Sequence, residues 1–207
     1  MIRHSKTNYY CMRTARAYRA TEWVRLVTEY RYMKWTPEPL NPLQHKKMEM
    51  TLDRYSAKDQ FRDKVDFFDY AGPDRTSDWL LIDASAEWCG PCQAVSLWLG
   101  GGPDYYNLEP ELGGFRAAVD DGSVFWVTVL TQDINYLPGD VPAAKRWDEE
   151  FGHPNVPVMT DPDQVIEDYI IGYYGGWPAG IAVKLNTMRV KQPGHVLDAA
   201  EYNAGSQ

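Results

Sequence analysis

Cysteine is scarce in this chain of 207 residues, which has only Cys11, Cys89 and Cys92. A framework of structural disulfides needs several cysteine pairs, so this class of fold is excluded. Histidine is scarce too, and a zinc site built on Cys89 and Cys92 would lack a second pair of ligands at suitable spacing. We therefore expect no bound metal. The four scattered histidines are His4, His45, His153 and His195.

Long apolar runs are also missing. No segment approaches the roughly 18 apolar residues of a membrane-spanning helix, and the first residues lack the apolar core of a secretory signal. As written, the chain is expected to stay in the cytoplasm. A misassigned start or a removed leader would instead allow a periplasmic or envelope location.

Positive charge is in deficit, since 21 Lys and Arg face 29 Asp and Glu and the net charge is -8. This balance argues against a general nucleic-acid binder. The charge is uneven, because residues 1–35 hold eight Lys or Arg against Glu22 and Glu29. That segment is a basic arm on an otherwise acidic chain.

Two parts of the chain differ in pattern. Residues 14–33 have apolar residues at helical spacing with arginines between them, which predicts an amphipathic helix. It is expected to pack on the domain, with a role at a membrane surface or in targeting as the alternative. Three prolines within residues 37–42 then indicate a linker. We predict a basic N-terminal helical extension with a Pro-rich linker in residues 1–47 and one globular domain in residues 48–207. Cys11, in the extension, has no predicted role.

The predicted domain alternates strands and helices, which indicates an α/β sheet covered on both faces. Residues 79–86 and 124–130 are apolar and predict buried strands. Asp140 is a predicted N-cap, and Asp161 followed by Pro162 predicts the start of another helix, with Val165 on its buried face. The expected strands are 48–55, 79–86, 124–130, 156–160, 177–185 and 188–191. The expected helices are 93–99, 141–151 and 162–171, and residues 105–119 are expected to continue the helix of residues 93–99 after a Gly/Pro break.

The motif Trp88-Cys89-Gly90-Pro91-Cys92 joins a predicted buried strand to a predicted helix. Two thiols at this spacing can form and open a disulfide reversibly. The strand, the motif and the helix, with Asp83 six residues before the first cysteine, resemble the thioredoxin superfamily. The segment between the motif and Pro178 is closest to the branch of envelope thiol reductases and peroxiredoxin-like proteins. The resemblance, over roughly residues 48–200, implies a three-layer sandwich with a central mixed β-sheet flanked by helices.

The chemistry requires one ionised, accessible thiol and one that resolves the mixed disulfide. Cys89 would lie at the helix N-terminus, where backbone N–H groups and the helix dipole lower a thiol pKa below its free value of about 8.5. Cys92, one turn inside, is expected to be shielded. Asp83 lies in an apolar strand, so we expect it to be buried and to take the proton from Cys92.

The resemblance also implies a substrate-binding surface around a cis-proline. Pro178 is the expected cis-proline, with Pro157 as its competitor, and cis bonds are rare enough to be meaningful. Trp88 and Trp177 would flank the site as an apolar contact surface. Gly90 and Pro91 complete the expected substrate-binding residues.

These features predict a thiol-disulfide oxidoreductase that reduces protein disulfides and needs no cofactor beyond its cysteine pair. Its expected partners are protein thiols or disulfides and an upstream electron donor, with no nucleic acid; a membrane contact through the basic helix is the less favoured alternative. Two other functions stay open. One is a binding or redox-sensing module without turnover. The other is a peroxiredoxin-like antioxidant protein, although Ala86 stands where that family places a Thr.

Overall fold

The computed structural model describes residues 50–191 and 194–198. The predicted helix of residues 14–33, the linker, Cys11, His4 and His45 lie outside the described residues, so the boundary at residue 47 stays a prediction. Within the described ranges no helix is long and apolar enough to cross a membrane. The same residues contain no group of three or more His, Cys, Asp or Glu side chains placed to hold a metal ion.

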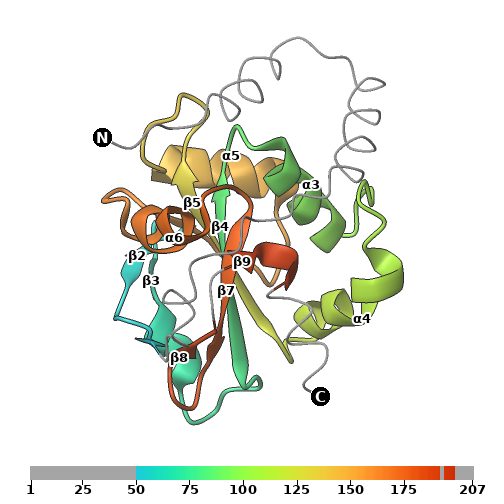
Figure 1. Cartoon of the computed structure of the whole chain (residues 1–207), viewed down its shortest axis with the longest axis vertical. Coiled ribbons are helices and arrows are strands. Elements are labelled where there is room, and N and C mark those ends of the chain that lie inside the picture. Colours follow the sequence, from blue (N-terminus) through green and yellow to red (C-terminus); the bar gives the residue numbers. More distant parts are fainter. Residues whose placement is uncertain (1–49, 192–193, 199–207) are drawn as a thin grey trace, which may run out of the picture. The chain divides into compact units, whose positions relative to one another are not determined.

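A mixed β-sheet forms the centre of the described domain (Figure 1). β4 pairs in parallel with β5 and antiparallel with β7, while β5 pairs in parallel with β6. A separate two-stranded sheet joins β2 (Ser56–Lys58) to β3 (Lys64–Asp66). The strand order of the central sheet is β1 (Met50–Thr51), β8 (Arg189–Val190), β7 (Ala179–Lys184), β4 (Trp79–Ala86), β5 (Phe125–Gln132) and β6 (Val158–Thr160), and β9 (Gly194–His195) also pairs with β7.

β4 and β5 are interior strands of the sheet, and most of their side chains on both faces are apolar. Every residue of β4 after Trp79 is buried, and Ile82 pairs with Val127 in the parallel register. The next pair in this register is Asp83 with Thr128. The predicted strand 79–86 is confirmed, and β5 extends two residues beyond its predicted end to Gln132. Those two residues, Thr131 and Gln132, lie at the site described below.

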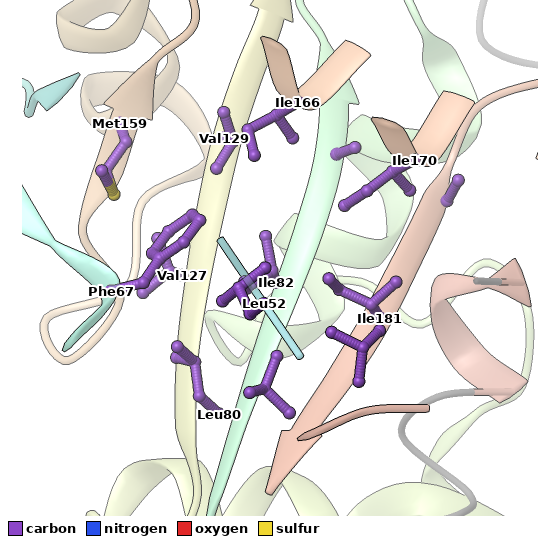
Figure 2. Close-up of a cluster of buried hydrophobic side chains, with 14 of the residues drawn as sticks. Leu52, Phe67, Leu80, Ile82, Val127, Val129, Met159, Ile166, Ile170 and Ile181 are labelled. Atoms are coloured by element: carbon purple, nitrogen blue, oxygen red, sulfur yellow. The ribbon is translucent and has the colours of Figure 1, made fainter. Parts of the chain in front are cut away.

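Helices cover both faces of the sheet. On one face α3 (Gly90–Leu99) and α4 (Glu109–Asp120) pack Trp98 and Phe115 with Trp126, and α5 (Val141–Phe151) packs with Leu130. On the other face lie the short helix η2 (Phe67–Ala71) and the π-helix η3 (Glu167–Ile171), which continues as α6 (Gly172–Tyr174). Figure 2 shows Phe67, Ile166 and Ile170 over the strands on this second face. The predicted three-layer sandwich is confirmed.

The helix after the glycine break differs from the prediction. We expected residues 105–119 to continue the preceding helix, but α4 is a separate helix that begins at Glu109. The Asp104 carboxylate explains this start, because it accepts hydrogen bonds from the backbone N–H groups of Leu108 and Glu109 at 2.8 and 2.9 Å. The strand expected over 48–55 is described only at Met50–Thr51.

The helical segment after Asp161 also begins later than predicted. Gln164 has a φ of 56°, in the left-handed region, so Pro162 does not open the helix. The Asp161 carboxylate instead accepts from the N–H groups of Ile166 and Glu167. Val165, predicted to be buried, is 49 % exposed, whereas Ile166 and Ile170 are buried.

Candidate active site

The cysteine pair lies where β4 ends and α3 begins. Cys89 is the N-cap of α3, and Pro91 lies in the first turn, where no backbone N–H is needed. Cys89 and Cys92 form a disulfide with their Cα atoms 5.3 Å apart. The backbone N–H of Cys92 points at Cys89 Sγ from 3.3 Å. This helix N-terminus is placed to stabilise negative charge on Cys89 after reduction.

Cys89 is less accessible than the sequence indicated, whereas Cys92 is shielded as expected. We expected Cys89 to be exposed, but in the disulfide form only 2 % of Cys89 and 1 % of Cys92 is exposed. They belong to a small apolar cluster that includes Trp147 of α5, and Trp88 and Trp177 pack against it. The expectation of an exposed Cys89 is wrong for the oxidised protein, because side chains distant in the sequence cover the motif.

Asp83 is buried, as predicted, with 1 % of the residue exposed. It lies on the face of β4 that α3 covers, and its carboxylate accepts hydrogen bonds from Ser85 Oγ at 3.0 Å and Thr128 Oγ1 at 3.2 Å. Burial raises the pKa of Asp83 to about 7, although its contacts with Ser85, Thr128 and Trp126 act in the opposite direction. The Trp126 influence is weak, because Nε1 of that indole makes no hydrogen bond of ordinary geometry. A carboxyl group that titrates near neutrality is suited to proton transfer.

The Trp177–Pro178 peptide bond is cis, and it is the only cis bond within the described ranges. Pro157, the competing candidate, therefore has a trans bond. Pro178 directly precedes β7, in which Ala179 pairs with Ala84 near the end of β4. The antiparallel pairing of β7 with β4 thus brings the cis-proline to the end of the sheet from which the cysteine motif begins.

Trp88 and Trp177 meet at the site, with ring centroids 5.2 Å apart in an edge-on arrangement. Trp88 Nε1 donates to Gln132 Oε1, and Trp177 Nε1 donates to Thr131 Oγ1, each at 3.0 Å. Both indoles are therefore anchored to the last two residues of β5. The sequence did not single out Thr131 or Gln132, since polar residues at a strand end carry no distinctive pattern.

Glu87 is a second residue that sequence reasoning missed. Its side chain is mostly buried and accepts two hydrogen bonds from the Arg146 guanidinium at 2.7 and 2.8 Å. It also accepts from the backbone N–H of Ile134 at 2.8 Å. Glu87 thus connects the cysteine motif to α5 and to the loop after β5. The available signal was an acid placed between Ala86 and Trp88 in an otherwise apolar run.

Neither a scan against protein-family models nor a search of curated proteins finds a match. Among solved structures, the chain is similar to the thioredoxin domain of a thiol-disulfide oxidoreductase from Bacteroides vulgatus, with 16 % identity, a TM-score of 0.50, and coverage of 76 % of this chain and 94 % of that one.

A second similar structure is a thioredoxin-like protein from Bacteroides caccae. It has 9 % identity and a TM-score of 0.52, and the match covers 93 % of this chain and 58 % of that one. At such low sequence identity, the similarity shows that the fold is shared. The chain has the thioredoxin-like fold, as the sequence resemblance implied.

Proposed function

We propose that this thioredoxin-like chain is a thiol-disulfide oxidoreductase that reduces disulfides in other proteins. One observation carries the proposal: the Cys89–Cys92 disulfide lies at the N-terminus of α3, on the sheet face that holds the buried Asp83. The cis bond before Pro178 supports it. The cysteine pair is the only redox group that the reaction needs.

In the first step the Cys89 thiolate attacks one sulfur of the target disulfide. The target S–S bond breaks, a bond forms between Cys89 and the attacked sulfur, and the other target sulfur leaves as a thiolate. The N–H of Cys92, which points at Cys89 Sγ, favours the attacking anion.

In the second step the Cys92 thiol loses its proton and attacks Cys89 Sγ. The mixed disulfide breaks, the Cys89–Cys92 disulfide forms, and the second target thiolate leaves, so two electrons have passed to the target. We assign the proton to Asp83, because its raised pKa lets the carboxylate accept a proton near neutral pH. An upstream dithiol donor then reduces the cysteine pair.

The target chain is proposed to lie against Trp88, Trp177 and Pro178, with Gly90 and Pro91 beside the reacting sulfur. Both indoles are half-buried and anchored, so they present preformed apolar surface.

The Gly-Pro spacer favours the reducing direction, as the resemblance implies. We place the reaction in the cytoplasm, where glutathione keeps thiols reduced, with the periplasm or envelope as the alternative. The reduction potential of the Cys89–Cys92 pair tests the reducing direction and the location. We expect a value of roughly -270 mV, whereas a value of roughly -120 mV would indicate an oxidant acting outside the cytoplasm.

The decisive experiment traps the intermediate. In a Cys11→Ser background, which leaves no third thiol, Cys92→Ser should accumulate a mixed disulfide with a disulfide-containing test protein, visible by non-reducing electrophoresis and mass spectrometry. Cys89→Ser is the matched control and should trap nothing. Trapping by neither variant, with a cysteine pair that does not cycle, would favour a binding module without turnover.

A further inference from the structure

Exposed apolar side chains gather beside the disulfide. Large exposed hydrophobic residues are few in the described domain, and three of them, Ile134, Tyr136 and Leu137, lie within four positions of one loop, 49 %, 51 % and 59 % exposed. Tyr136 packs on Trp88, with ring centroids 5.1 Å apart. We call Trp88, Ile134, Tyr136 and Leu137 together the apolar shelf. Apolar groups gathered at the surface mark interaction sites, since scattered ones are normal and clusters are not.

The loop that carries the shelf is held rigidly. The Asp133 carboxylate accepts from the N–H groups of Asn135 and Leu137, and Asp133 N–H donates to the Leu137 carbonyl at 2.7 Å. Tyr136 has a φ of 65°, a conformation that is uncommon for a residue with a Cβ. The loop returns to the sheet at Gly139, where a Cβ would overlap the Leu130 carbonyl oxygen. These contacts hold apolar side chains outward, in water, at no benefit to the core.

The shelf is continuous with the redox centre. Tyr136 contacts Trp88, and Trp88 contacts Trp177, so an aromatic path runs from the loop to the residue before the cis-proline. The Ile134 N–H donates to Glu87, two residues before Cys89. A polypeptide whose disulfide reaches Cys89 therefore has the shelf within reach of its neighbouring side chains.

Carboxylates surround the shelf. Asp133 contacts its loop directly, Asp140 caps α5 where the loop ends, and Glu167 accepts from the Gln132 side chain at 2.7 Å. The nearby Arg146 is paired with the mostly buried Glu87, so this ion pair adds no net charge to the surface. The pKa of Arg146 is raised by Glu87 first and also by Asp140 and Asp133, which places these charges together. No Lys or Arg occurs in residues 147–183. The surface beside the disulfide is thus apolar at its centre and acidic around it.

We propose that the apolar shelf docks a basic polypeptide segment, so that the preferred substrate is a protein disulfide flanked by apolar side chains and by Lys or Arg. This inference rests on the proposed function and names its substrate class. The apolar residues bind the shelf, and the cationic groups lie against the carboxylates around it. Complementary charge speeds encounter and rejects acidic partners, while the rigid loop lowers the entropy cost of binding.

The test compares two cyclic disulfide peptides that differ only in charge, with Lys-Leu or Glu-Leu beside each cysteine. The full chain carrying Cys11→Ser is reduced, and the second-order rate constant with each peptide is divided by that peptide's rate with dithiothreitol, which removes differences in intrinsic reactivity. We expect a preference of about tenfold for the basic peptide at low salt, shrinking to within about twofold at high salt.

Two variants locate the effect. Ile134→Ser combined with Leu137→Ser should lower the normalised rate with the basic peptide about fivefold. Asn135→Lys should reduce the preference for the basic peptide about threefold. Tyr105→Ser is the matched control for the first, since Tyr105 is 51 % exposed but lies beyond the C-terminal end of α3. Asp74→Asn is the matched control for Asn135→Lys, because it changes the net charge by the same amount. Asp74 precedes β4 and lies toward the opposite end of that strand from the cysteine motif.

Three results overturn the inference: equal normalised rates for the two peptides, a shelf double variant that behaves like Tyr105→Ser, or a dimer that the double variant dissociates in sedimentation, which would make the shelf a self-association surface. A small neutral disulfide, hydroxyethyl disulfide, keeps the two proposals apart. If the wild-type pair cannot reduce it, the proposed function fails; if it can and the peptides are not distinguished, only the substrate class fails.

Discussion

The redox centre and the loop after β5 lie side by side but are built in opposite ways. At the proposed redox centre the residues that we assign to the reaction are buried: Cys89, Cys92 and Asp83 are each at most 2 % exposed. In the loop of residues 133–140 the conspicuous groups are exposed, and the polar ones hold the backbone. Burial changes the pKa of a group and so serves chemistry, whereas exposure serves contact with a partner. The comparison predicts that substitutions in the first region change reactivity, and those in the second change selectivity.

The largest effect is expected from Cys89→Ser. The variant lacks the attacking sulfur, so disulfide reduction should fall by at least about a thousandfold, to the level of the solution without protein. Insulin reduction followed by turbidity measures it. Cys11→Ser is the control and should keep the wild-type rate; a Cys89→Ser protein that retained substantial activity would remove the redox centre from the mechanism.

Asp83→Asn should stabilise the oxidised protein, increasingly so as pH rises. The folded-state pKa of Asp83, about 7, lies above the unfolded value, so its contribution to stability is full below the unfolded pKa and is lost as pH rises through 7. The amide does not titrate. Between pH 5 and pH 8 the advantage of the variant should grow by on the order of 2 to 3 kcal/mol, measured by urea unfolding.

Two companion measurements sharpen the Asp83 prediction. Asp74→Asn, at an exposed position, should show no such pH-dependent gain. In rapid-mixing experiments Asp83→Asn should slow the resolution of the mixed disulfide and spare the first attack. Wild-type rates for both steps would assign Asp83 a structural role alone.

Arg146→Met should destabilise the protein by about 2 kcal/mol, because it leaves the mostly buried Glu87 carboxylate without its ion-pair partner. This is below the cost for a fully buried pair, since the Arg146 side chain is 48 % exposed and screened by water. Urea unfolding measures the loss, and Glu87→Gln added to the variant should restore part of it. A change of less than about 0.5 kcal/mol would show that the pair does not hold the loop.

The smallest effect on stability is expected from Ile134→Ser combined with Leu137→Ser. Both side chains are about half exposed, so their loss should change the free energy of unfolding by less than about 1 kcal/mol. The same variant is expected to lower the normalised rate with the basic peptide about fivefold. A large destabilisation would make the shelf part of the packing and erase the contrast between the two regions.

Much of the redox centre was predictable because its signals are local. The strand at 79–86, the cysteine motif and the N-cap at Asp140 are each encoded by neighbouring residues, and all three are observed. The burial of Asp83 followed from its apolar neighbours. Two predictions failed for different reasons. The helix after Asp161 starts late because that carboxylate caps N–H groups five and six residues further on, whereas the burial of Cys89 depends on side chains distant in the sequence, such as Trp147.

By itself, the sequence determined the alternation of strands and helices, the spacing of Cys89 and Cys92, and the apolar setting of Asp83, since each depends on local pattern. Only the tertiary structure decided which segments meet. The pairing of β7 with β4 brings Pro178 to the cysteines, and the end of β5 anchors Trp88 and Trp177. Glu87 holds a loop 47 residues away through the Ile134 N–H. Contacts between such distant positions form only when the sheet assembles, and no local pattern in the chain encodes them.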